Sequence, residues 1–138
     1  MAEEEQESLA EAFWSVARQL RHLTRETLAP WDVTPSQSRA MGVLHRHGTM
    51  RLRELAEHLR IAPRSATEVV DGLESRDVVE RLPDPHDRRA TLVRLTPHGV
   101  DVGHAIRAAR AVEAEGYFGA LDEADRADLT RILRTLRQ

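Results

Sequence analysis

Two groups of side chains in this sequence have residue types and spacing suited to recognising a nucleic acid. One group follows a proline on a predicted helix: Arg64, Ser65, Thr67 and Glu68. The other is a short charged run: Asp87, Arg88 and Arg89. Hydroxyl and guanidinium groups can donate hydrogen bonds to phosphates and base edges, and a glutamate can accept one from cytosine N4. These residue types therefore predict contacts to double-stranded DNA rather than covalent catalysis.

Arg89 is the strongest single candidate, because a guanidinium on a hairpin tip can enter a narrow minor groove, where negative potential is focused. We expect Asp87 to brace Arg89 through a charge-assisted hydrogen bond. We expect Arg88 to contact a phosphate or to brace the loop. The alternative for this run is a solvated turn, and the alternative for the helical group is an ordinary polar face.

Five further residues are candidates for contacts to the DNA backbone: Ser36, Gln37, Arg39, Arg51 and Arg53. The first three begin a predicted helix, whose free backbone amides can meet a phosphate. The two others flank the start of the next helix. For the first three, the alternative is that they only cap the helix.

Apolar side chains repeat at steps of three and four residues, which predicts helices along most of the chain. The expected helices cover residues 7–29, 35–47, 51–59, 63–77, 97–117 and 122–136. Two runs rich in β-branched residues, 78–82 and 91–95, predict strands on either side of a protruding polar tip at 84–89. The predicted order in the middle of the chain is helix, turn, helix, wing.

Capping residues support several of these boundaries. Thr34 and Gln37 have the spacing of a capping box. Gly48 suits the end of the same helix, since glycine readily adopts the left-handed backbone that often follows a helix. Thr96 and Asp122 are expected to cap the last two helices.

Composition limits the classes of protein to consider. The 138 residues and a hydrophobic fraction of 41% suit a single domain with one core. The sequence has no cysteine, which excludes disulfides, thiol redox sensing and Cys-ligated zinc. Its seven histidines lack the spacing of a ligand cluster, so we expect no metal and no cofactor. The acidic start, 1–5, is unlike a signal peptide, and no apolar run is long enough for a membrane span, which predicts a cytoplasmic protein.

Charge is unevenly distributed along the chain. The formal net charge is -3, yet residues 36–99 contain 11 Arg against 9 Asp and Glu. A local basic patch is sufficient for contacts to DNA, so the overall charge does not exclude them.

The first helix and the last two helices each carry an apolar stripe that the central segment is too small to cover. In the last helix the side chains expected to be buried are Leu129, Ile132, Leu133 and Leu136. A second copy of the chain, arranged symmetrically, would cover all three stripes. The pattern therefore predicts a homodimer.

Over nearly its whole length the chain resembles the MarR family of bacterial transcription regulators. The resemblance rests on two segments, LRELAEHLRIAPRSATEVVDGLESRDVVER and PDPHDRRATLVRLTPHG. Its most diagnostic part is the Asp-x-Arg of Asp87 and Arg89 followed by Leu-Thr-x-x-Gly, from Leu95 to Gly99.

The resemblance implies a mainly α fold with a small β-hairpin wing. Residues 34–96 would form the winged helix-turn-helix, and 1–30 with 97–138 a helical dimerisation region. It further implies a repressor that binds a palindromic operator as a homodimer and responds to a ligand. Trp14 and Trp31 lie near the place where relatives bind aromatic acids, so they are candidates for the pocket of a small aromatic or phenolic effector, with core packing as the alternative.

Three residues depart from the family pattern. Ala62 stands where the recognition helix usually has a Ser or Thr cap, and Glu68 stands where a basic or amide residue is common. Asp77 replaces a common glycine.

Two other classes of function compete with DNA binding. Nothing in the sequence has the context of a nucleophile with its base or of a phosphate-binding loop, so we expect no enzyme. A winged helix that contacts only other proteins remains the alternative, although the arginines of the wing argue against it.

Overall fold

The computed structural model describes residues 6–138, and the acidic start at 1–5 lies outside the described residues. The elements are α1 (Leu9–Leu28), η1 (Ala29–Trp31), α2 (Pro35–His47), β1 (Met50–Arg51), α3 (Leu52–Leu59), α4 (Pro63–Ser75), β2 (Val79–Asp84), β3 (Asp87–Leu95), α5 (Pro97–Phe118) and α6 (Glu123–Leu136). The predicted class, mainly α with a small wing, is confirmed.

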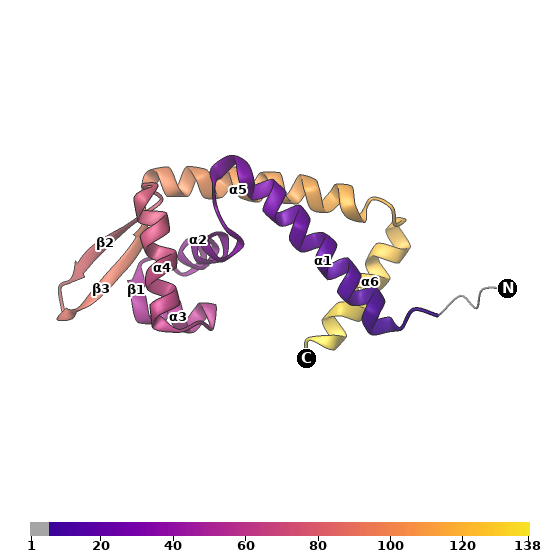
Figure 1. Cartoon of the computed structure of the whole chain (residues 1–138), viewed down its shortest axis with the longest axis horizontal. Coiled ribbons are helices and arrows are strands. Elements are labelled where there is room, and N and C mark those ends of the chain that lie inside the picture. The colour runs from indigo at the N-terminus through magenta and orange to yellow at the C-terminus, as the bar shows by residue number, and fades with distance from the viewer. Residues whose placement is uncertain (1–5) are drawn as a thin grey trace.

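The elements form two regions (Figure 1). We call α2 to α4 with the three strands the winged lobe, and α1, α5 and α6 the helical arm. In Figure 1 the hairpin of β2 and β3 projects from the lobe on the side opposite the arm, and α5 runs from the lobe to the far end of the arm. The arm therefore extends away from the segment that carries the candidate site residues.

The core lies inside the winged lobe. Its largest fully buried side chains are Leu28, Leu55, Leu73, Val70, Val79 and Val93. The arm contributes to this core only where its helices meet the lobe, through the last turn of α1 and through Ile106 of α5. Every residue of α6 is half-buried or exposed within one chain, which agrees with the expectation that the lobe is too small to cover this apolar stripe.

The three strands form an antiparallel sheet in the order β1-β3-β2. The short strand β1 was not predicted, since it exists only because Met50 pairs with Val93, far along the chain. The predicted polar tip at 84–89 was too long: the strands run to Asp84 and resume at Asp87. Carboxylates of these two residues accept hydrogen bonds from backbone amides at the tip, which lets strand pairing continue almost to the end of the hairpin.

Caps form at most of the predicted places. Thr34 and Gln37 make the capping box of α2, and Gly48 ends that helix with a φ of 79°. Asp122 caps α6. The break expected between residues 117 and 122 is also present, since α5 ends at Phe118 and α6 begins at Glu123.

The Leu-Thr-x-x-Gly segment joins α5 to the end of α4. The Thr96 hydroxyl donates to the Asp77 carbonyl at 2.6 Å and accepts from the Gly99 amide at 2.9 Å. A Cβ at residue 99 would lie 1.9 Å from the Val78 carbonyl oxygen. Only glycine permits this close approach, which explains why the motif ends on one.

Candidate nucleic-acid interface

The polar side of α4 faces outward because its apolar side is held in the core. Ala66, Val70 and Leu73 are fully buried. On the other side Arg64, Ser65 and Glu68 are exposed, and Thr67 is half-buried, with its hydroxyl donating to the Pro63 carbonyl at 3.1 Å. The structure thus brings the four predicted side chains onto one outward-facing surface of a rigidly held helix.

The start of α4 has no side-chain cap. Ala62 occupies the N-cap position with an extended backbone, φ -63° and ψ 148°, and its methyl group cannot accept a hydrogen bond. Because the first backbone amides of a helix point along its axis, this end of α4 can approach an anion closely.

The second half of α4 is tied to the wing. Arg81 of β2 donates from Nη1 to Glu74 at 2.8 Å and from Nη2 to Asp71. Burial disfavours the charge on Arg81, but the hydrogen bonds to these carboxylates outweigh it and raise the pKa of the guanidinium. Asp71 and Glu74 are therefore paired within the lobe, whereas Glu68 is exposed on the outward side.

In the wing, the backbone rather than the guanidinium of Arg89 is braced. Asp87 accepts from the Arg89 amide at 2.9 Å, so the expected ion pair between these side chains is wrong in this structure. Both Arg88 and Arg89 are exposed. Their side chains remain available to a ligand at the end of the hairpin.

The base of the hairpin tip rests on a buried carboxylate. Asp84 is 7% exposed and accepts from the His86 amide and from Arg51 Nε, each at 2.9 Å. The backbone hydrogen bond from His86, followed by the contacts to Arg51, lowers the pKa of Asp84 despite its burial. Arg51 is thus a brace between β1 and the wing, a role that sequence reasoning missed because the two residues are 33 positions apart.

A cleft of about 290 Å³ separates the start of α3 from the wing. Its lining includes Arg51, Arg53 and Arg89, together with Leu52, Asp87, Ala90 and Thr91. Three arginines from three elements therefore meet around a space of suitable size for a phosphate group.

The residues at the start of α2 divide into two groups. Ser36 is exposed. Gln37 is buried, and its amide oxygen accepts from the Thr34 amide at 3.1 Å. Arg39 donates from Nη2 to the Leu59 carbonyl at 2.9 Å, which fastens α2 to the end of α3. The capping alternative therefore describes the side chain of Gln37, and the side chain of Arg39 is exposed but fastened to α3.

The two tryptophans lie far apart. Trp14 is exposed on α1, and Trp31 packs against the core of the lobe from η1. Trp14 lies 14 residues before Leu28, the last residue of α1, and Trp31 comes after it. At a rise of 1.5 Å per residue, that part of the helix alone is roughly 20 Å long. A different hollow, of about 430 Å³, lies between α1 and α5 and is lined by Leu20, Leu23, Thr24, Thr27, Arg107, Arg110, Ala111, Glu113 and Ala114.

Sequence reasoning missed Arg107 and Arg110 in this hollow. Their spacing of three residues on one helix face was the available signal.

The described residues also bear on metal binding and on membrane insertion. Within 6–138, three or more metal-ligating side chains do not gather at any one point. Across the same residues, helices that combine the length and the apolar character needed to cross a membrane are also absent.

Comparisons with known proteins agree with this geometry. A family model described as the MarR family matches residues 33–91. The HTH-type transcriptional regulator ML2140 of Mycobacterium leprae is 36% identical over 102 residues, which are 74% of this chain and 68% of ML2140. The HTH-type transcriptional repressor MdtR of Bacillus subtilis is 27% identical over 113 residues, which are 82% of this chain and 73% of MdtR.

Solved structures show the same arrangement. The crystal structure of a MarR variant from Escherichia coli complexed with operator DNA is similar with a TM-score of 0.79 and 26% identity. The match covers 93% of this chain and 92% of that one. The shared architecture therefore includes the helical arm as well as the winged lobe.

Proposed function

The chain belongs to the MarR family, and from this premise we propose that it is a transcription regulator that binds an inverted-repeat operator in double-stranded DNA. The observation that carries the proposal is the pairing of α4, whose polar side faces outward from a closed core, with a wing that ends in two exposed arginines. A helix of this kind fits the major groove, and an arginine on an adjacent hairpin fits the minor groove.

Each candidate residue receives a role in this proposal. Arg64, Ser65, Thr67 and Glu68 contact base edges and nearby phosphates in the major groove. Arg89 enters the minor groove, with Arg88 on the flanking backbone and Asp87 holding the local fold of the strand.

In this proposal, fewer residues contact the phosphates of the DNA backbone than the sequence predicted. Arg53 and Arg51 line the cleft beside the wing, and Ser36 is exposed at the start of α2. Gln37 and Arg39 hold the lobe together through their side chains, so we assign them to positioning rather than to phosphate contact.

We propose that the regulator acts as a homodimer joined through the helical arm. The exposed apolar side chains of the arm are Leu9, Phe13, Trp14 and Val16 on α1, Val112 on α5, and Ile132 and Leu136 on α6. Phe13 also faces Leu133 and Leu136 across a hollow where α1 meets α6. At about 25 cal/mol per Å² of buried apolar surface, covering these side chains with a second copy is strongly favourable.

We further propose that the protein is a repressor released by a small aromatic or phenolic acid. The support is the hollow between α1 and α5, which combines apolar side chains with the guanidinium groups of Arg107 and Arg110. This hollow, and not the separated tryptophans, is our candidate for the effector site. Repression is favoured by the relative MdtR, which is named as a repressor.

The test is selection from a library of genomic DNA fragments at near-physiological salt, followed by sequencing of the bound fragments. Enrichment of an inverted repeat with half-sites about ten base pairs apart supports the proposal. Affinity for the selected fragment should fall with salt, with a log–log slope near -0.9 for each phosphate neutralised. A folded dimer with almost no affinity for any DNA contradicts the proposal and favours the protein-interaction alternative.

A further inference from the structure

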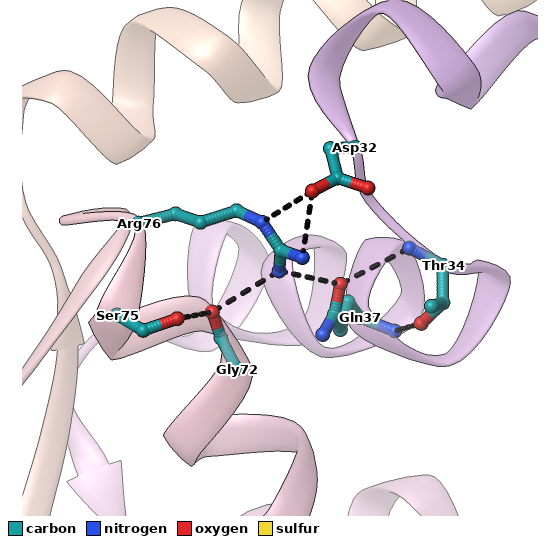
Figure 2. A network of polar contacts seen from close by, with 6 residues as sticks. All are labelled: Asp32, Thr34, Gln37, Gly72, Ser75 and Arg76. Atoms are coloured by element: carbon teal, nitrogen blue, oxygen red, sulfur yellow. Dashed lines mark hydrogen bonds and ion pairs between the residues drawn. The ribbon is translucent and has the colours of Figure 1, made fainter.

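Arg76 lies at the end of α4 and joins that helix to two others (Figure 2). Its Nε and Nη2 donate to the same carboxylate oxygen of Asp32, at 3.3 and 3.0 Å. Its Nη1 donates to the Gln37 amide oxygen at 3.3 Å and to the Gly72 carbonyl at 3.1 Å. All three guanidinium nitrogens therefore have partners, on α4, on α2 and on the junction between α1 and α2.

The partners of Arg76 are themselves held in place. Asp32 has a left-handed backbone, φ 53°, at the end of η1, so it stands at the point where the chain passes from the arm to the lobe. The Gln37 amide oxygen that meets Arg76 also accepts from the backbone amide of Thr34, as part of the α2 capping box. Arg76 thus connects to two residues whose positions are set by backbone geometry.

Gly72 makes the contact between α4 and α2 close enough for this network. A Cβ at residue 72 would lie 2.4 Å from Nε2 of Gln37. Its carbonyl accepts from Arg76 and also from the Ser75 hydroxyl, at 2.8 Å, which leaves the last turn of α4 well satisfied (Figure 2). A larger residue at this position would therefore have to displace the Gln37 amide group from the network.

The network serves orientation more than stability. The side chain of Asp32 is 88% exposed, and ion pairs with such exposed carboxylates contribute little to folding. A planar guanidinium with three fixed partners nevertheless restricts both angle and register, which a single flexible charge cannot do. The other hydrogen bonds that hold α4 run elsewhere. Arg81 joins it to β2, and the Asp77 carbonyl, just after the helix, joins it to Thr96 at the start of α5.

We infer that Arg76 is a positioning residue that fixes the angle of α4 relative to the junction with the arm. In a symmetric dimer this angle sets the distance between the two recognition helices, and therefore the half-site spacing that the protein accepts. This second consequence rests on the proposed function. The first is a property of one chain and can be tested without DNA.

The test of the angle uses spin labels on an otherwise cysteine-free protein. Cysteines are introduced by Arg25→Cys on α1 and Glu68→Cys on α4, both at exposed positions, and the labelled protein is diluted with unlabelled chain. We expect Arg76→Gln to broaden the distance distribution between the labels at an unchanged thermal midpoint. Asp32→Asn, which alters only an exposed side chain, should broaden it less, and Arg76→Lys should give an intermediate width.

The matched control is Arg94→Gln, which breaks an exposed ion pair with Glu80 inside the hairpin and leaves the junction intact. This control should keep the narrow distribution of the parent protein. Equal widths for the parent, Arg76→Gln and Asp32→Asn overturn the inference, as does broadening by the control to the same extent.

The consequence for DNA is measured with synthetic inverted repeats whose half-site spacing varies by single base pairs. We expect Arg76→Gln to reduce the preference for the best spacing by about tenfold, while Arg94→Gln leaves the preference unchanged. A preserved preference despite a broadened label distance would confine Arg76 to orienting the single chain and overturn its role in spacing. If the parent binds none of the repeats, the proposed function fails, and the label measurement alone decides whether Arg76 sets the angle.

Discussion

The winged lobe and the helical arm differ most clearly along α1 and α5, the two helices of the arm that also contribute to the core of the lobe. In α1, Leu28 at the lobe end is 0% exposed, whereas Leu9 at the far end is 88% exposed. In α5, Ile106 is 3% exposed and Val112, less than two turns further along, is 73% exposed. The lobe therefore covers its own apolar surface, while the arm presents apolar surface that one chain cannot cover.

The two regions also use their polar groups differently. In the lobe, several arginines are paired with carboxylates or carbonyls from other elements, as Arg39, Arg51, Arg76 and Arg81 are. Among the described residues of the arm, the ion pairs of Glu26 with His22 and of Asp128 with Arg131 join neighbours on one helix. Side-chain hydrogen bonds between helices of the arm are fewer: Tyr117 donates to Gln19 at 2.8 Å, and Arg126 donates to the Phe118 carbonyl at 3.0 Å. Polar contacts between elements are thus concentrated in the lobe, where they hold the outward side of α4 in a fixed orientation.

The largest expected effect compares glycines at the two ends of α5. Gly99→Ala should destabilise the protein by about 4 kcal/mol or more, because the new Cβ meets the Val78 carbonyl at the closed junction of the lobe. Gly116→Ala, in the arm, has open space around it and should stabilise the helix by roughly 0.5–1 kcal/mol. Denaturant unfolding measures both, and equal effects would remove the distinction between a closed lobe and an open arm.

A charge placed on the arm should break the association of two chains. Phe13→Asp puts a carboxylate where α1 meets α6 and should weaken the dimer by about 3 kcal/mol, more than a hundredfold in dissociation constant. Sedimentation measures the change, and the far-ultraviolet circular dichroism spectrum of the protein should be preserved. Arg18→Asp, at an exposed polar position of the same helix, is the control. A parent protein that sediments as a monomer at micromolar concentration would contradict the dimer itself.

Loss of the wing arginine should affect DNA and leave the arm untouched. Arg89→Ala should weaken operator binding by about 2 kcal/mol, since a minor-groove contact is lost while the strand keeps its backbone bond to Asp87. Fluorescence anisotropy with the selected operator gives the affinity, and sedimentation checks that the dimer persists. Unchanged affinity would remove the wing from the mechanism.

The smallest expected effect is the acid response of the wing brace. The pKa of Asp84 is lowered in the folded protein, so its ionised form stabilises the fold at any pH above the ordinary aspartate value of about 3.9. This contribution is lost as the pH falls through the lower folded value. The difference in unfolding free energy between the parent and Asp84→Asn should therefore stay constant from pH 7 to pH 5 and shrink below pH 4. A difference that shrinks between pH 7 and pH 5 would contradict the assignment.

Local hydrogen bonds explain what could be predicted from the sequence. Three helices start at a side chain that accepts a hydrogen bond from the backbone amide three residues later: Thr34 for α2, Thr96 for α5 and Asp122 for α6. These predicted starts are confirmed. The outward face of α4 follows from helical periodicity in the same way. These features depend on near neighbours, which a single sequence displays directly.

The features that were missed depend on residues far apart in the chain. Arg51 meets Asp84 across 33 positions, and Arg76 meets Asp32 across 44. Neither pair has a local signal, so Arg51 was predicted as a phosphate contact alone and Arg76 was not singled out. The apolar stripe of α6 differs from these pairs, because its periodicity is visible in the sequence and already indicated a surface that one chain does not cover.

The unbroken course of α5 has a mechanical consequence. With 22 residues rising 1.5 Å each, the helix is a stiff rod about 33 Å long that begins against the end of α4 and reaches the far end of the arm. Tilting such a rod by about 5° displaces one end by roughly 3 Å relative to the other, close to the 3.4 Å rise between stacked base pairs. A change of packing in the arm that is too small to alter any secondary structure is therefore large enough to move a lobe by about the distance between two stacked base pairs.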